Sequence, residues 1–377
     1  MAETEKPAGG LRNVVVSESR ISSIDGERGI LAYRGIDIHA LAESSTFEEV
    51  VFLLHRGVLP RRAELKAFTE ALAAERDVPP AVIRVLRDLP AGTHPMTALR
   101  TLVSALGALD PAAEDDSEAA NAAKARRLTA QMGTLVALID RIRRGSDPVA
   151  PDPALPHASN FLYMLTGQRP TATAARALDL ALVLHADHEF NASTFAARVA
   201  ASTLADMHGA ITAALATLKG PLHGGANEAV MHMLETVGTP DRAEAFLAEA
   251  FAAKRKIMGF GHAVYRTEDP RATHLRPLAR ALGEEAGDGR WYALSERIEA
   301  IVRARKGLNT NVDFYSASAY RSLGIPTDLF TPVFAVSRIS GWTAHVLEQL
   351  SNNKLIRPES AYTGPRNVPY LPLDQRG

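Results

Sequence analysis

The sequence predicts an all-α protein with one small β-hairpin near its N-terminus. Apolar residues recur at intervals of three and four over most of the chain, which is the spacing of one helix face. Almost nothing after residue 34 alternates between polar and apolar with a period of two, as a half-buried strand would. A single Asp-Gly turn between two short apolar runs accounts for the hairpin.

The first elements can be placed from their turn and cap residues. The hairpin joins residues 21–24 to residues 30–33 through Asp25-Gly26, a dipeptide that supplies the positive φ angles of a tight turn. Thr46 and Glu49 have capping-box spacing and precede an apolar run, so they predict a helix start. A later helix is predicted from one apolar face, made of Met96, Leu99, Leu102, Val103, Leu106 and Leu109.

Three further stretches predict how the helices are connected and packed. The Pro- and Asp-rich residues 145–153 either link two domains or cross the surface between helices of one domain, and the immediate return of helical pattern favours the crossing. Residues 178–184 are apolar except for Asp179 and leave little room for a polar face, which predicts a buried helix. Small residues dominate 192–218; this composition suits a helical subunit interface, which we favour, and a tightly packed core nearly as well.

The bulk properties exclude several classes of protein. Lys and Arg number 42 against 43 Asp and Glu, a net charge of −1, so no nucleic-acid partner is expected. The chain has no cysteine, which excludes disulfides, thiolate metal sites and cysteine nucleophiles. No run approaches the roughly 18 apolar residues of a membrane span. Residues 1–10 resemble a frayed tail and not a signal peptide. We therefore expect a soluble, cytoplasmic protein without membrane contact.

Two histidines and one aspartate lie in short runs suited to removing a proton beside a carbonyl. His223 stands among a proline and three glycines, a sequence that favours a helix entrance, where the positive field keeps an imidazole neutral and able to donate to an oxyanion. The alternative is a turn histidine without a role. His262 is likewise flanked by glycines, which let a ligand approach the backbone closely. Asp313 has apolar and aromatic neighbours that raise the pKa of a carboxyl, although it could equally cap a helix beginning near Phe314.

Other polar residues are candidates for binding an anion. Arg271 follows Asp269-Pro270 and could hold a carboxylate with two hydrogen bonds, although alone it is better explained as a surface residue. Arg338 lies in an apolar helical run, where a guanidinium needs an anionic partner. The cluster from His185 to Glu189 invites a metal site, but it lacks a recognised ligand spacing. A buried histidine held by neighbouring carboxylates and reaching into a polar cavity is the better interpretation.

Taken together and in this order, the motifs closely resemble those of the citrate synthase family. The resemblance covers nearly the whole chain, from Ile24-Asp-Gly26 to Arg357-Pro358. It is most specific in five runs, namely His188-Glu-Phe-Asn-Ala-Ser-Thr-Phe195, Pro221-Leu-His-Gly-Gly-Ala-Asn227, Gly259-Phe-Gly-His262, Asp269-Pro-Arg271 and Asn311-Val-Asp-Phe-Tyr315. The length is similar to that of the short bacterial and archaeal homodimers of the family.

The resemblance implies two helical domains that close around the substrates. Residues 1–223 and 321–377 would form the large domain, with the subunit interface and the oxaloacetate site. Residues 224–320 would form a smaller inserted domain with the coenzyme A site and the catalytic aspartate. Closure would exclude water before condensation.

The resemblance also implies a reaction, a Claisen-type condensation in the tricarboxylic acid cycle. His223 would polarise the thioester carbonyl of acetyl-CoA while Asp313 removes a methyl proton, and His262 would polarise the ketone of oxaloacetate. The dicarboxylate would be bound by His188, Arg271 and Arg338. Arg357 would reach in from the partner subunit of a homodimer and complete that subunit's site.

The resemblance implies that coenzyme A is a co-substrate and that no metal or tightly bound cofactor is needed. Its contacts are predicted in two segments, and the matching residues are Lys256, Met258, Gly259, Phe260, Gly261, Lys306 and Asn311. One departure is Thr310, where family members usually have proline, and this loosens the expectation of a rigid loop.

Two alternatives to a citrate synthase remain open from the sequence. A 2-methylcitrate synthase, which uses propionyl-CoA, shares these motifs, and one extra methylene changes pocket binding by only about 1–3 kcal/mol. A non-catalytic relative that binds coenzyme A is the more remote alternative, since all three catalytic positions are filled.

Overall fold

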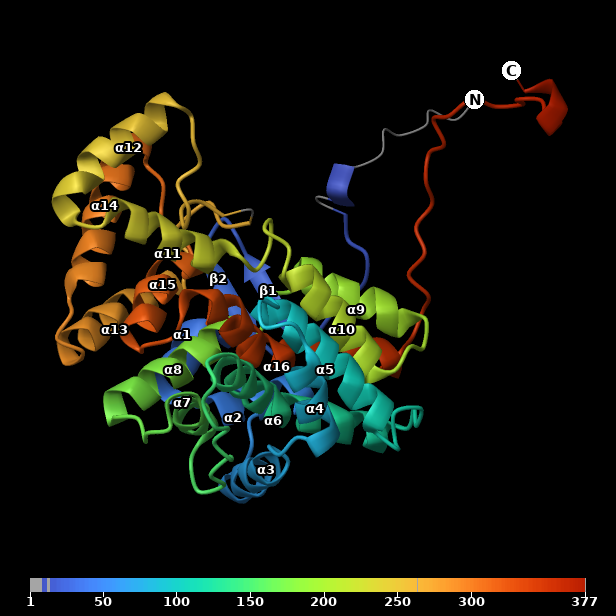
Figure 1. The fold of residues 1–377 in the computed structure, drawn as a ribbon, viewed down its shortest axis with the longest axis horizontal. Coiled ribbons are helices and arrows are strands. Elements are labelled where there is room, and N and C mark those ends of the chain that lie inside the picture. Colours follow the sequence, from blue (N-terminus) through green and yellow to red (C-terminus); the bar gives the residue numbers. More distant parts are fainter. Residues whose placement is uncertain (1–8, 12–13, 263, 377) are drawn as a thin grey trace.

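The computed structural model describes residues 9–11, 14–262 and 264–376. Within them the chain forms sixteen α-helices and one small antiparallel sheet (Figure 1). The helices are α1 Ile38–Ser44, α2 Phe47–Arg56, α3 Arg62–Ala74, α4 Pro80–Asp88, α5 Pro95–Leu109, α6 Glu118–Arg143, α7 His157–Thr166, α8 Ala172–His185, α9 Ala192–Ser202, α10 Met207–Leu218, α11 Ala226–Val237, α12 Ala243–Ala252, α13 Ala272–Glu285, α14 Arg290–Lys306, α15 Val312–Ser322 and α16 Phe330–Ser351. The strands are β1 Ser22–Asp25, β2 Ile30–Tyr33 and β3 Ile36–Asp37. The prediction of an all-α fold with one small β-hairpin is confirmed.

The predicted hairpin is confirmed, but its turn is not the expected one. Strands β1 and β2 pair from Ser22↔Tyr33 to Asp25↔Ile30, which leaves a four-residue loop between them. Positive φ occurs at Gly29, with φ 66°, and not at Asp25-Gly26. The short strand β3 was not predicted, because its two residues are too few to show a period.

The predicted helix starts and faces are largely confirmed. The Thr46 side chain accepts a hydrogen bond from the amide of Glu49 at the start of α2, as a capping residue does. In α5 five of the six predicted apolar positions are buried, and Leu109 is the exception because it ends the helix, 45% exposed. Residues 145–153 form the predicted connection between two helices, α6 and α7.

The core is built around α16, which is buried on every side from Phe330 to Val346. It packs against α6, α9, α10, α2 and α8. Gly341 permits the closest of these approaches, since a Cβ there would lie 2.4 Å from the carbonyl oxygen of Ala186. The predicted buried stretch 178–184 lies in α8, where all but two of its residues are buried. The run 192–218 forms α9 and α10, which pack on each other, and its use in a subunit interface stays a prediction.

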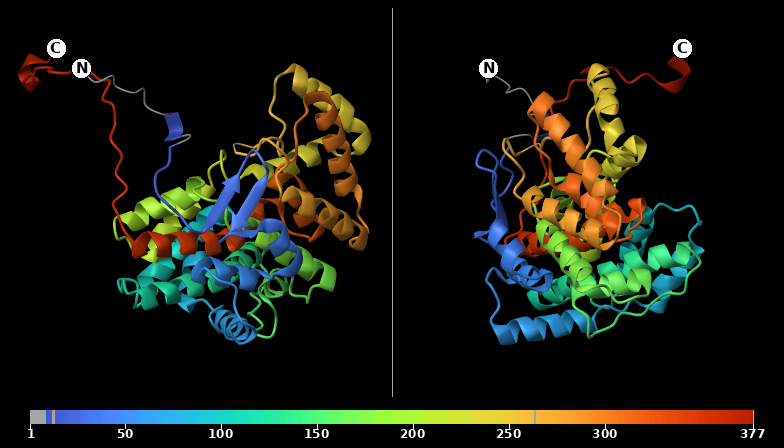
Figure 2. Two further views of the ribbon diagram at one scale, coloured as in Figure 1. Left: turned by 180° about the vertical axis from the view of Figure 1, so that it is seen from behind. Right: turned by 90° about the vertical axis from the view of Figure 1, so that its left-hand side faces the viewer.

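Helices α11 to α15 form a lobe beside this core, at the upper left of Figure 1. Within the lobe α13 packs on α15 and α12 on α14, while α13 also reaches α8 of the core. The loops that link these helices face the hairpin of β1 and β2, as both views in Figure 2 show. The division of the chain into domains at residues 224 and 320 stays a prediction.

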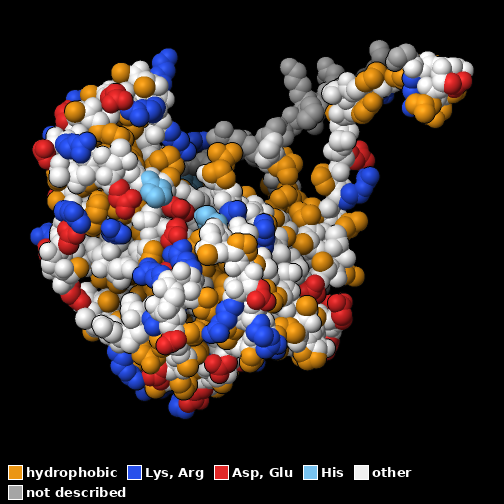
Figure 3. Space-filling model, in the orientation of Figure 1, with side chains coloured by type: hydrophobic (Ala, Val, Ile, Leu, Met, Phe, Trp, Pro, Cys, Tyr) orange, Lys and Arg blue, Asp and Glu red, His pale blue; other side chains and the backbone are white. Residues whose placement is uncertain are grey.

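The two ends of the chain run away from the helical body (Figure 1). After α16 the chain is extended and mostly exposed, and hydrophobic side chains such as Tyr370 and Leu373, 83% and 77% exposed, lie along it (Figure 3). A groove of about 1320 Å³ lies at the base of both ends, lined in part by Val16, Phe195 and Leu355. The predicted frayed tail falls almost wholly outside the described residues.

The described residues contain neither a membrane-spanning helix nor a cluster of side chains that could bind a metal ion. No helix among them is long and apolar enough to cross a membrane. No group of three or more His, Cys, Asp or Glu residues in the same part of the chain could hold a metal ion.

Candidate active site

His223 lies in the glycine-rich turn before α11, and its ring reaches the N-terminus of α9. Its Nε2 accepts a hydrogen bond from the amide of Ser193, 3.2 Å away, which is one of the amides that a helix leaves free in its first turn. The same Nε2 lies 2.8 Å from the Ser193 hydroxyl. The neutral imidazole therefore carries its proton on Nδ1. Burial, aided by the charge of Arg338, lowers the pKa of His223 to about 4. A neutral ring was predicted from the field of the helix that follows it, whereas burial and the charge of Arg338 are what lower its pKa, and the helix that the ring meets is α9.

His262 ends a short segment that pairs with the residues before α15. Its Nδ1 accepts hydrogen bonds from the amides of Val264 and Tyr265, at 3.0 and 3.2 Å, so the proton of the neutral ring is on Nε2. Burial, with the charge of Arg271, lowers the pKa of His262 to about 4. Both glycine-flanked histidines are thus neutral donors at physiological pH, each held in one tautomer by main-chain amides.

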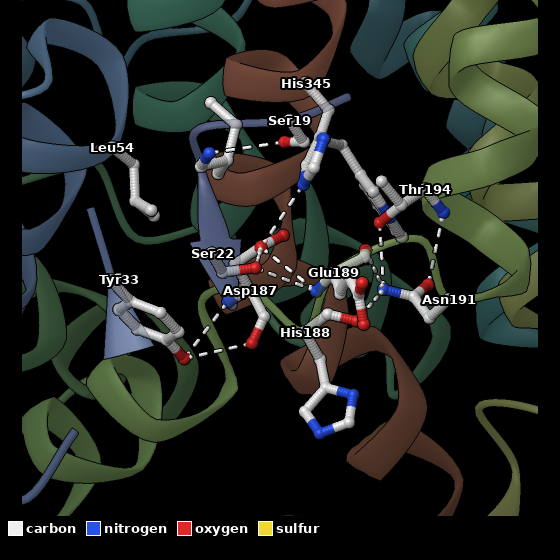
Figure 4. A network of polar contacts seen from close by, with 12 residues as sticks. Ser19, Ser22, Tyr33, Leu54, Asp187, His188, Glu189, Asn191, Thr194 and His345 are labelled. Carbon is white, nitrogen blue, oxygen red and sulfur yellow. Dashed lines mark hydrogen bonds and ion pairs between the residues drawn. The ribbon is translucent and has the colours of Figure 1, made fainter. Parts of the chain in front are cut away.

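His188 is placed by a network of hydrogen bonds to the backbone and side chains around it (Figure 4). The preceding residue, Asp187, is fully buried and accepts hydrogen bonds at Oδ2 from the Ser22 hydroxyl, at 2.5 Å, and from His345. The His188 ring points away from this network, and its Nε2 lies 3.2 Å from the hydroxyl of Tyr265. The expectation that carboxylates hold this histidine is therefore wrong, because the carboxylate of Asp187 binds His345 instead.

The rings of His188 and His262 lie side by side, with centroids 5.3 Å apart. Burial and the nearby charge of Arg271 hold the pKa of His188 well below its usual range. Because both rings are neutral, they can stand this close without repulsion and can donate to one small polar ligand.

Asp313 lies in the first turn of α15, one residue beyond its start. Asn311 is the cap of this helix, and its side chain accepts a hydrogen bond from the amide of Asp313 at 3.1 Å. Capping as the role of Asp313 is therefore wrong. Its carboxyl is half-buried beside apolar residues, and desolvation raises the pKa of Asp313 to about 6, against the opposing charge of Arg271. A carboxylate with such a pKa is a stronger base than an ordinary aspartate.

Arg271 is buried and held by a carboxylate, not exposed as its sequence alone suggested. Its Nε and Nη2 donate to the two carboxylate oxygens of Asp269, at 2.9 and 2.8 Å. The same carboxylate accepts the amide of Val312 at 3.1 Å, so it ties Arg271 to the first turn of α15. Burial alone would raise the pKa of Asp269, but the guanidinium of Arg271 lowers it. The pair fixes a cation at the base of the site.

Arg338 is buried in α16, and among the described residues no carboxylate forms an ion pair with it. Its Nε donates to the carbonyl of His185 at 2.7 Å, and its guanidinium lies over the ring of Phe334. Burial lowers the pKa of Arg338 to about 10, which is still far above neutral, so the cation persists. A buried guanidinium without a carboxylate partner is suited to an anionic ligand, as the sequence predicted.

Four of the predicted residues are electrostatically linked through the two arginines. The charge of Arg338 acts on the pKa of His188, His223 and Asp313, and that of Arg271 acts on His188, His262 and Asp313. The structure therefore brings together three imidazoles, one carboxylate and two guanidinium groups, although they come from distant parts of the chain.

The segment predicted to contact coenzyme A is joined to the residues before α15 by backbone hydrogen bonds. The amide of Gly261 donates to Asn309, and that of Asn311 donates to Gly259, at 3.0 and 2.9 Å. The Asn311 side chain adds a bond to the carbonyl of Gly261. Phe260 and Thr310 form an isolated β-bridge, so the loop is held in place without the proline usual in the family.

Three further residues that were predicted to bind a substrate, Lys256, Lys306 and Arg357, lie away from this cluster or at its edge. The exposed Lys256 is close enough for its charge to lower the pKa of Asp313 slightly. Lys306 lies over the ring of Phe251, at the far end of α14. Arg357 is exposed on the C-terminal segment, lines the groove at its base and is not brought to its own chain's histidines.

Sequence reasoning missed the residues that hold the others in place. Ser193 and Asp269 lie within the runs that were singled out, and Tyr265 lies three residues after one of them, but no role was assigned to these residues. Asp269 could have been found, because a carboxylate two residues before an arginine is a ready partner for it. The contact of Ser193 with His223 joins two distant segments and leaves no local signal.

Comparison with known proteins identifies the family. The model of the family described as citrate synthase, C-terminal domain, matches residues 10–359. A citrate synthase of Haloferax volcanii is 50% identical over 372 residues, which cover 97% of this chain and 98% of that one. A 2-methylcitrate synthase of Mycobacterium tuberculosis is 44% identical, with coverage of 94% and 90%.

A solved structure is similar over the full length as well. It is the ternary complex of citrate synthase from Thermoplasma acidophilum with carboxymethyl coenzyme A and oxaloacetate. It has a TM-score of 0.92 at 34% identity, and the match covers 99% of this chain and 100% of that one. The chain belongs to the citrate synthase family. It is an enzyme of the citrate synthase type, a transferase, as the sequence predicted.

Proposed function

We propose that this enzyme condenses acetyl-CoA with oxaloacetate and hydrolyses the product to citrate and coenzyme A. The observation that carries the proposal is the pairing of a carboxyl whose pKa is raised with neutral imidazoles of fixed tautomer, beside a buried guanidinium that lacks a carboxylate partner. The names of the similar proteins support the same reaction.

The first step is removal of a methyl proton from the thioester by the carboxylate of Asp313. This proton is too weakly acidic for a carboxylate alone, so the enolate oxygen needs a donor. The Nδ1–H of His223 supplies it, and such preorganised donors contribute about 3–4 kcal/mol. Because the pKa of His223 is lowered to about 4, the ring is neutral at physiological pH, and its Nδ1–H is available as a hydrogen-bond donor.

The second step is attack of the enolate carbon on the ketone of oxaloacetate. The Nε2–H of His262 points its proton at the ketone oxygen and protonates the alkoxide as the new carbon–carbon bond forms. His188, Arg271 and Arg338 bind the two carboxylates, and Arg338 gains the anionic partner that its burial calls for. Water then cleaves the thioester, which yields citrate and coenzyme A.

We further propose that the lobe of residues 224–320 closes as a domain over the rest of the chain and that two chains form a homodimer. Arg357 would enter the partner's site, which accounts for its position on an exposed segment far from its own chain's histidines. Exposed hydrophobic side chains along the same segment would be covered by the partner.

A 2-methylcitrate synthase is the second candidate, favoured by the 44% identity to a protein of that name. The test is coenzyme A release with oxaloacetate, measured in parallel with acetyl-CoA and propionyl-CoA and a thiol reagent. The protein has no cysteine and adds no background. A higher kcat/KM with acetyl-CoA supports the first proposal, and a higher value with propionyl-CoA supports the second. No release with either substrate would contradict both.

A further inference from the structure

The N-terminal hairpin contacts two other segments of the chain, one that leads into His188 and one that follows His262. At its base the Ser22 hydroxyl and the Tyr33 hydroxyl donate to the carboxylate and the carbonyl of Asp187, at 2.5 and 3.0 Å. These bonds fix the residue directly before His188, as Figure 4 shows. The base of the hairpin therefore supports the loop that carries one of the two adjacent imidazoles.

The tip of the hairpin contacts the loop that follows the other imidazole, His262. The carbonyl of Gly26 accepts a hydrogen bond from the amide of Arg266 at 2.8 Å. This loop, residues 264–268, also supplies the two amides that bind Nδ1 of His262. It leads directly into Asp269, which holds Arg271. A displacement of the loop would thus move two groups of the site together.

Glycine is required at two positions of the tip because the loop lies so close. A Cβ on Gly26 would stand 2.4 Å from the carbonyl oxygen of Val264, although the φ of Gly26 suits any residue. A Cβ on Gly29 would stand 2.5 Å from Oγ1 of Thr267 and 3.1 Å from the carbonyl oxygen of Glu268. Backbone atoms cannot rotate away as a side chain can, so any larger residue at Gly26 must push the loop back.

The tip is itself rigid, so it can act as a fixed support. The carboxylate of Asp25 accepts hydrogen bonds from the amides of Glu27 and Arg28, at 3.1 and 3.0 Å. Below it, β1 and β2 pair over four residues each. The hairpin therefore spans from one histidine loop to the other as a single stiff element.

We propose that the hairpin is a brace that sets the spacing of His188 and His262, and that Gly26 and Gly29 are positioning residues for the binding of oxaloacetate. The assignment of a ligand rests on the proposed function. In the proposed two-domain arrangement, the hairpin belongs to the large domain and residues 264–268 belong to the small one. Their contact at Gly26 therefore also limits how far the small domain can move towards the large one when it closes.

The test compares two glycine substitutions with matched controls. Gly26→Ala adds a methyl group against the loop, whereas Gly92→Ala adds one in open space, and neither glycine has a positive φ. Gly29→Ala combines backbone strain with the contact. Gly35→Ala, in the turn between β2 and β3, has the strain without any atom within 4 Å. Each pair thus isolates the contact with residues 264–268.

We expect Gly26→Ala to lower kcat/KM for oxaloacetate by about tenfold or more relative to Gly92→Ala, since a displacement near 1 Å in a site can cost that much. The amides of residues 264–268 should also exchange hydrogen faster than in Gly92→Ala. Thermal stabilisation by added oxaloacetate should fall in parallel. A general loss of stability would not single out one loop and one ligand.

Equal kcat/KM and equal hydrogen exchange in Gly26→Ala and Gly92→Ala would overturn the proposal. If Gly26→Ala does not fold, as judged by its helical circular dichroism, Gly29→Ala against Gly35→Ala decides the question by the same readouts. An inactive wild-type enzyme would contradict the proposed reaction instead, and hydrogen exchange would still test the brace.

Discussion

The dicarboxylate side and the acyl-CoA side of the proposed site are built in different ways. On the first, Arg271, Arg338 and His188 are buried and oriented by hydrogen bonds that the chain itself supplies. On the second, His223 lies in a glycine-rich turn next to the fully exposed Leu222, and Asp313 is only half-buried. One side is fully buried, and the other is half-buried.

This difference predicts an order of events. The dicarboxylate side is already ordered and can bind its ligand without ordering further groups, so it suits the first substrate. The half-buried side loses its remaining contact with solvent when a ligand and the closing lobe cover it, which suits the second substrate. Substitutions on the two sides should therefore affect different kinetic constants.

The largest effect is expected on the half-buried side. Asp313→Asn removes the base and should lower kcat by about 10²- to 10⁴-fold, with little change in the affinity for oxaloacetate. The raised pKa of Asp313 means that the folded state disfavours the ionised carboxyl, so the variant should unfold at a higher temperature than the wild type at neutral pH. Steady-state kinetics and thermal melts measure both. Near-normal turnover would show that another group is the base.

The next effect should appear on the dicarboxylate side. Arg338→Gln should raise KM for oxaloacetate by about 10²-fold, because removing one partner of a buried charge pair costs roughly 2–5 kcal/mol. The matched control is Arg76→Gln, an equally buried arginine that bonds to the carbonyls of Asp152 and Leu155 instead. An equal rise of KM in both variants would show a general effect of losing a buried arginine and would refute the comparison.

A smaller and graded effect is expected from pH. With the pKa of Asp313 raised to about 6, kcat/KM should fall about tenfold per unit below that pH, where the carboxyl is protonated, and stay level above it. The pKa values of His223 and His262 near 4 keep both rings neutral on the plateau. A pH profile of kcat/KM checks this. A fall that begins only near pH 4 would place the essential base elsewhere.

The smallest effect should come from a chelator. Neither side of the site relies on a metal in the proposed mechanism, so dialysis against EDTA should leave activity unchanged. Activity measured before and after dialysis, with added Mg²⁺ as a control, decides this. A loss that Mg²⁺ or Zn²⁺ restores would require a different mechanism.

The sequence predicted the elements and residues whose causes are local. Helix faces and the cap at Thr46 follow from spacing and neighbours, and they are confirmed. The turn at Gly26 was predicted wrongly, and the cap considered as an alternative role for Asp313 belongs to Asn311, because a register or a cap shifted by a few residues leaves the same residue types in place.

The sequence could not predict the contacts that join distant segments. Asp187 pairs with His345, the amide of Ser193 reaches His223, and Gly26 meets the loop after His262 only because the chain folds back on itself. These contacts decide which tautomers and which spacings the site has. Residue types therefore indicated the chemistry, and the tertiary structure supplied its geometry.

The amides that bind His223 and His262 have a consequence for how this enzyme can evolve. Every residue except proline brings the same amide to positions 264 and 265, so substitution of the side chains there leaves the proton position of His262 unchanged. At His223 the hydroxyl of Ser193 also contacts the ring, at 2.8 Å. Substitutions near His262 can then change which substrate is preferred, while the Nε2–H donor of this ring is kept. Only a proline at one of these positions would remove the inherited constraint in a single step.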